Sequence, residues 1–116
     1  MTETVIDPQA LEILKSMTDP AFLVELIDTY LTDSPVLIEQ MSIGLASGEI
    51  ELVRRAAHSL KSNSASFGAN QLASAARELE LIAKSGTLDG AESKLAVIEQ
   101  EFVQVAPILL ELKNEC

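Results

Sequence analysis

The spacing of apolar residues constrains the fold of this chain most strongly. Apolar side chains recur every three or four residues along almost the whole sequence, without the strict alternation of a half-buried strand. A repeat near 3.6 residues places such side chains on one face of an α-helix. Only four prolines and five glycines interrupt the pattern. The sequence therefore predicts an all-α protein.

Prolines and glycines divide this pattern into helices. Two Asp-Pro pairs, at 7–8 and 19–20, combine an N-cap residue with proline at the first helical position. They predict a short helix that ends near Met17 and a second helix that starts at the next proline. The apolar phase of the second helix continues past Pro35, so we expect one long kinked helix that ends at Gly48.

Three further helices follow in the prediction. One covers about residues 49–67, and the next extends from an N-cap at Asn70 to the Ser-Gly pair at 85–86. The last, over about residues 90–113, has the alternating three-four spacing of a helix-bundle seam. Pro107 lies inside it and is expected to bend it.

The connections between these helices are short, which favours antiparallel neighbours. We therefore expect an antiparallel up-down-up-down four-helix bundle over about residues 20–113, preceded by a short extra helix. A chain of 116 residues is long enough for one core and too short for two, so residues 1–116 are interpreted as a single domain. The starting Met1 and the compact end favour a free-standing monomer.

Composition argues against several classes of function. The net charge of −10 argues against general nucleic-acid binding, which needs a basic face. No run approaches the roughly 20 apolar residues of a membrane span, and no basic region precedes an apolar one at the N-terminus. We therefore expect a soluble cytoplasmic protein. With one histidine and one cysteine, no metal or other cofactor is expected.

Positive charge is concentrated in the middle of this acidic chain. Residues 54–84 hold five of the eight basic residues and only two of the eighteen acidic ones. The only histidine, His58, lies in this segment. It is roughly 200° around the helix axis from Leu60, so it faces away from the apolar stripe. That stripe consists of Val53, Ala56, Leu60, Ser64 and Phe67.

The outward face around His58 carries four polar neighbours. Arg54 and Arg55 lie one turn before it, and Lys61 and Ser62 lie one turn after it. An exposed imidazole among cations is a candidate nucleophile, because the cations disfavour the imidazolium form. The same cations would attract the oxygens of a phosphoryl group, and Lys61 is the best placed of them.

A longer motif surrounds this histidine. His58-Ser-Leu-Lys-Ser-Asn-Ser64 is followed by Gly-Ala at 68–69, by Leu72, and by Leu-Glu at 79–80. This pattern resembles the signature of histidine phosphotransfer domains, called HPt domains, in which His-x-Leu-Lys-Gly-x-Ser is followed by the same later residues. The resemblance extends over most of the chain.

Two positions depart from the family pattern. Ser62 stands where glycine is most common, and Ala76 stands where cysteine is often found. Ser62 is still small enough for a partner to approach the imidazole, although its hydroxyl can hinder that partner or bond to it. We therefore assign Ser62 to the partner-binding surface. Ala76 concerns packing only.

The resemblance implies a function in a two-component phosphorelay. His58 would accept a phosphoryl group from the aspartyl phosphate of one receiver domain and pass it to the aspartate of another. The implied partners are response-regulator receiver domains and a hybrid sensor kinase, with Mg²⁺ supplied by the receiver. The chain has no glycine-rich nucleotide loop, so we interpret it as a phosphoryl carrier rather than a kinase or other enzyme. Neither nucleic acid nor membrane is an expected partner.

The resemblance also implies roles for residues on the following helix. Glu80 matches the position whose side chain hydrogen-bonds and orients the histidine, and Lys84 matches a position that lines the site. Taken alone, Glu80 could equally be a surface charge or the i, i+4 ion-pair partner of Lys84. Arg54 and Arg55 are interpreted as a general electrostatic patch for an acidic partner. Apolar residues of the first two helices are expected to form the docking surface.

Two other functions remain alternatives at this point. One is a helical-bundle adaptor that binds receivers or other proteins without phosphotransfer, which would not need His58, Lys61 or a small residue at position 62. The other is a hydrolase with His58 as general base, which would need a second reactive group beside the imidazole.

Overall fold

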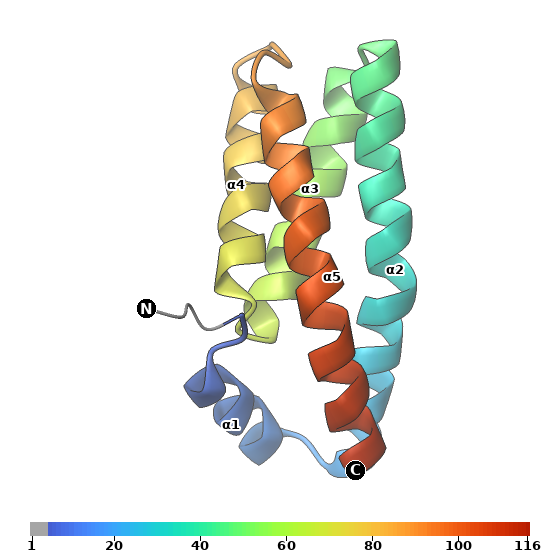
Figure 1. Cartoon of the computed structure of the whole chain (residues 1–116), viewed down its shortest axis with the longest axis vertical. Coiled ribbons are helices and arrows are strands. Elements are labelled where there is room, and N and C mark those ends of the chain that lie inside the picture. Colours follow the sequence, from blue (N-terminus) through green and yellow to red (C-terminus); the bar gives the residue numbers. More distant parts are fainter. Residues whose placement is uncertain (1–4) are drawn as a thin grey trace.

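The structure is a computed structural model that describes residues 5–116, and every regular element in that range is a helix (Figure 1). The five helices are α1 (Pro8–Met17), α2 (Pro20–Ser47), α3 (Ile50–Ser66), α4 (Asn70–Lys84) and α5 (Ala91–Glu115). The all-α prediction is confirmed. Residues 1–4, which include Met1 and the start of the segment searched for a secretory signal, lie outside the described residues.

Side chains cap the first two helices as their Asp-Pro pairs predict. The Asp7 carboxylate accepts a hydrogen bond from the Gln9 amide at 3.0 Å, and the Asp19 carboxylate accepts one from the Phe22 amide at 2.8 Å. Each cap satisfies an amide that has no partner within its helix. Further along, α2 continues through Pro35 without ending, so the prediction of one long helix is also confirmed.

The start of α4 differs from its prediction. Ala69 occupies the N-cap position without a side-chain cap bond, and Asn70 is already the first helical residue. Backbone hydrogen bonds close the preceding turn, from the Gly68 amide to the Ala65 carbonyl and from the Ala69 amide to the Ser64 carbonyl, both at 3.0 Å. These bonds fix where α4 begins, so the prediction of Asn70 as N-cap was wrong.

The four long helices contact one another in a closed order. α2 packs against α3 and α5, and α4 packs against the same two helices (Figure 1). The interface between α3 and α4 is the most extensive, and both helices carry small buried side chains, among them Ala57, Ala73 and Ala76. Small side chains allow two helix backbones to approach closely. This approach brings polar residues of α3 and α4 within bonding distance.

The short helix α1 is more loosely attached, because none of its residues is buried. The residues just before α1 attach it to the bundle. Ile6 is buried, and the Asp7 amide donates a 2.8 Å hydrogen bond to the carbonyl of Gly68. Gly68 has a φ of +75°, and a Cβ there would lie 2.7 Å from the Cβ of Ala10. Only glycine fits this contact between the start of α1 and the α3–α4 turn. Among the described residues, no helix is long and apolar enough to span a bilayer.

Candidate functional site

Helix α3 presents His58 to solvent by burying its opposite face. The five residues of the predicted stripe are all buried: Val53, Ala56, Leu60, Ser64 and Phe67. Ser64 adds a polar contact inside the core, because its hydroxyl lies 2.7 Å from the Tyr30 hydroxyl of α2. These buried contacts therefore fix the orientation of α3 about its own axis. His58 lies on the outer side with 56% of its side chain exposed, as its helical phase predicted.

Three side chains from two helices form one cluster at this position. Glu80 of α4 lies opposite His58 of α3, and its Oε2 is 2.7 Å from the imidazole Nδ1. Its other oxygen, Oε1, accepts a hydrogen bond from Lys61 Nζ at 2.9 Å. The Glu80 side chain is only 5% exposed, so this carboxylate bridges His58 and Lys61 from a buried position.

The pKa of Glu80 indicates whether its carboxyl group is ionised. Burial raises the pKa of the carboxyl, but hydrogen bonds from Lys61 and His58 and the charge of Lys61 outweigh burial. The net effect holds the pKa of Glu80 below its ordinary value. The group is therefore ionised at neutral pH and can act only as a hydrogen-bond acceptor.

The ionised carboxylate determines the tautomer of the imidazole. Because Glu80 can only accept, His58 Nδ1 must carry the proton of their hydrogen bond. In the neutral ring the lone pair is then on Nε2. Since the ring is more than half exposed, a reacting group can approach this nitrogen. Such an oriented, exposed imidazole has the geometry of a nucleophile.

The cations around His58 are less free than the sequence suggests. Arg54 forms an ion pair with Glu51 one turn earlier on α3, and Lys61 is bonded to Glu80. The hydrogen bond from Arg54 lowers the pKa of Glu51. The cationic setting predicted for the imidazole is therefore partly neutralised, because Glu80 contacts the ring and Lys61, and Glu51 pairs with Arg54.

The remaining predicted site residues lie on the same surface without such contacts. Arg55, Ser62 and Lys84 are exposed, and in residues 5–116 none of their side chains makes a hydrogen bond or an ion pair. The alternative ion pair between Glu80 and Lys84 is not formed, because both carboxylate oxygens face α3 instead. Glu51 was not considered in the sequence analysis, although its i, i+3 spacing to Arg54 is a signal for this pair.

Comparison with known families agrees with this geometry. A family model described as the Hpt domain matches residues 25–108, a range that contains His58, Lys61 and Glu80. The chain belongs to the Hpt domain family. Its members act in histidine phosphotransfer within phosphorelays, and receiver domains are the partners that this membership implies. The family resemblance stated from the sequence is thus confirmed.

A solved structure shows how far the Hpt fold extends. The chain is similar to histidine-containing phosphotransfer protein B (HptB) from Pseudomonas aeruginosa PAO1, with a TM-score of 0.91 and 28% sequence identity over 99% of each chain. The likeness includes α1, which lies outside the region matched by the Hpt family model. Comparison with the curated proteins found no match.

The hydrolase alternative requires a second reactive group beside His58. In the described part of the chain, the imidazole makes its one side-chain hydrogen bond with Glu80, and no serine or cysteine is bonded to it. A carboxylate on Nδ1 orients the ring, but hydrolysis by a covalent route also needs a nucleophile on the other nitrogen. The cluster therefore fits an Hpt domain better than a hydrolase.

Proposed function

We propose that this protein carries a phosphoryl group on His58 between receiver domains of a two-component phosphorelay. The observation that supports the proposal best is the hydrogen bond from Nδ1 to Glu80, which leaves the nucleophilic Nε2 on the exposed side. A hybrid sensor kinase and response-regulator receivers are the proposed partners. The closed order of helix contacts supports the proposed antiparallel four-helix bundle with an extra N-terminal helix. The chain is proposed to act as a single monomeric domain.

The transfer can be written with the atoms that the site provides. His58 Nε2 attacks the phosphorus of a receiver aspartyl phosphate, a P–N bond forms, and the bond from phosphorus to the aspartyl oxygen breaks. The receiver aspartate leaves as a carboxylate, with Mg²⁺ supplied by the receiver. In the second half, an aspartate of another receiver attacks the phosphorus and the P–N bond breaks. His58 then regains its lone pair, so the protein is a carrier and is unchanged after the cycle.

Glu80 and Lys61 have separate roles in this proposal. As Nε2 bonds to phosphorus, positive charge develops on the imidazole, and the Glu80 carboxylate on Nδ1–H stabilises that charge. Lys61 pairs with this carboxylate and lies one turn from His58, so its cation is available to attract phosphoryl oxygens. Arg54, Arg55, Ser62 and Lys84 are assigned to the surface that meets the receiver.

The direct test follows labelled phosphate from a phosphorylated receiver. We expect acid-labile, alkali-stable label on the wild-type protein and none on His58→Gln, because glutamine has no nucleophilic nitrogen. Ser59→Ala is the matched control, since it changes the next exposed residue of α3 and leaves the imidazole intact. If a panel of receivers labels neither the wild type nor the control, the adaptor alternative is favoured. Label on His58→Gln would place the phosphoryl group elsewhere.

A further inference from the structure

A second surface lies between α2 and α5. A groove of about 410 Å³ runs along this edge, lined on its apolar side by Pro35, Ile38 and Phe102. Val103 forms its outer lip and is 71% exposed. The groove is open and mostly apolar, so an apolar side chain of another molecule can pack into it and lose contact with water. We refer to this surface as the α2–α5 groove.

The groove and the His58 site lie at opposite edges of the molecule. His58 and Glu80 lie where α3 meets α4, whereas the groove lies where α2 meets α5. Because each helix packs against two neighbours in the order α2, α3, α4, α5 and back to α2, these two edges are separated by the core. A molecule bound in the groove therefore leaves His58 accessible.

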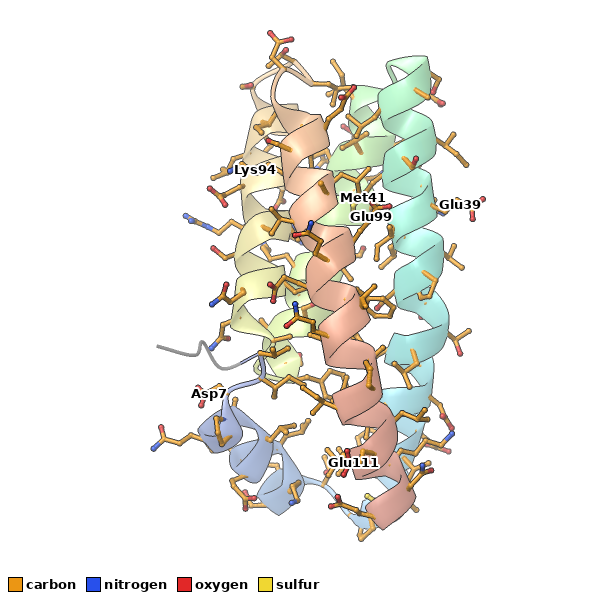
Figure 2. All side chains as sticks on the ribbon, viewed as in Figure 1. Asp7, Glu39, Met41, Lys94, Glu99 and Glu111 are labelled. Carbon is orange, nitrogen blue, oxygen red and sulfur yellow. The ribbon has the colours of Figure 1, made fainter. Side chains whose placement is uncertain are left out.

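Acidic side chains line the groove from both helices. Glu39 of α2 and Glu99 of α5 belong to its lining, and they lie at a similar height on the two helices (Figure 2). Both are exposed, and within residues 5–116 neither forms an ion pair. Further along the same edge, a carboxylate does have a cation: Asp28 of α2 pairs with Lys113 of α5 at 2.6 Å. An acidic side chain without an ion-pair partner among the described residues therefore borders the groove on each helix.

We propose that the α2–α5 groove binds a partner protein segment in which an apolar side chain is flanked by lysine or arginine. The apolar side chain would pack on Phe102 and Val103, and the cations would pair with Glu39 and Glu99. A second copy of this chain is a poor occupant, because its own groove is acidic and its net charge is −10. This binding goes beyond phosphotransfer and does not depend on the chemistry of His58.

The test uses a fluorescent amphipathic peptide of leucine and lysine, with a leucine–glutamate peptide of the same pattern as the control. At an ionic strength of about 0.15 M, we expect only the lysine peptide to raise the anisotropy on addition of the protein. The triple variant Glu39→Gln/Glu99→Gln/Val103→Ser should bind it about tenfold more weakly. Glu12→Gln/Glu111→Gln removes the same two charges from exposed positions outside the groove and should bind like the wild type.

Each other outcome contradicts the proposal. If both sets of variants bind the peptide equally weakly, the peptide responds to net charge rather than to the groove. If the wild type does not bind the peptide, the groove is not a binding site for such a segment. Amide chemical shifts provide an independent reading, since they should change on α2 and α5 and not around His58. We also expect His58→Gln to bind the peptide as tightly as the wild type, and weaker binding would place the peptide at the phosphotransfer site.

Discussion

Glu80 is the residue on which the local chemistry depends. It is the one charged side chain that is buried in the described part of the chain. Burying an unpaired carboxylate costs several kcal/mol, so such a group persists only with good partners. Here His58 and Lys61 occupy its two oxygens. The hydrogen bonds that offset the cost of burying this carboxylate also orient the imidazole.

The lowered pKa of Glu80 predicts a pH dependence of stability. A carboxyl whose folded pKa lies below its ordinary value of 4.5 binds fewer protons than the unfolded chain does. Its contribution to the free energy of unfolding is fully present above that value and is lost as the pH falls through the lowered pKa. Urea unfolding of wild type and Glu80→Gln should therefore differ most at neutral pH and converge in acid. A difference that does not change with pH would contradict this cause.

Lys61 is expected to contribute to the rate of phosphotransfer, although it lies at the protein surface. Lys61→Ala removes one of the two partners of the buried carboxylate and a cation one turn from His58, so we expect phosphotransfer from a receiver to slow by about tenfold or more. Rapid-quench measurement of labelled protein gives the rate. Lys94→Ala is the matched control, because it breaks an ion pair with Glu78 away from the site. Equal rates for Lys61→Ala and the control would remove the proposed role.

At the scale of helices, the crossing of α2 and α3 depends on Gly44. A Cβ at this position would lie 2.6 Å from Cγ2 of Val53 and 3.2 Å from the carbonyl oxygen of Glu49. The two helices meet there directly before and after the Gly48 turn. The absence of a side chain at Gly44 therefore sets how closely α3 approaches α2, and so how α3 presents its outer face.

This contact predicts a specific pattern of stabilities. Gly44→Ala should lower the free energy of unfolding by about 1–3 kcal/mol, because overpacking outweighs the gain in helix propensity. In a Val53→Ala background the same change should cost much less, since the clashing methyl group is gone. Urea unfolding of the four proteins measures this coupling. If the effects of the two substitutions on the free energy of unfolding are additive, Val53 is not the residue with which a side chain at position 44 clashes.

The helices themselves could be predicted from the sequence, because the phase of apolar residues within one helix depends only on that helix. This is why the outward position of His58 was predicted. The bridge from His58 through Glu80 to Lys61 depends on the register between α3 and α4, which no spacing rule specifies, and only the family resemblance pointed to Glu80. At Asn70, a side-chain preference was overridden by a backbone-bonded turn.

On the scale of the whole molecule, side chains of opposite charge that form no ion pair among the described residues lie at two opposite edges. Arg55 and Lys84 extend from the edge that holds His58, whereas Glu39 and Glu99 line the opposite edge. A cationic face on an acidic protein orients it as it approaches an acidic partner site. Partners of opposite charge can therefore be directed to different edges of one small protein.

This distribution predicts a salt dependence of the encounter with a receiver. Raising the ionic strength should lower the second-order rate of phosphotransfer, because screening weakens steering between a cationic edge and an acidic pocket. Arg55→Gln/Lys84→Gln should lower that rate at low salt and flatten its dependence on salt. Stopped-flow measurement at limiting protein concentration tests both expectations. A rate that does not change with salt would exclude steering by these residues.

The hydrogen bond between Glu80 and His58 also limits the identity of the phosphorylated product. An imidazole has two nitrogens, and a free histidine can in principle yield two phosphohistidine regioisomers. In the proposed relay the inner nitrogen is occupied by its proton and the carboxylate, so the product would be restricted to the isomer phosphorylated on Nε2. The fold would therefore select one phosphohistidine isomer before a receiver domain binds.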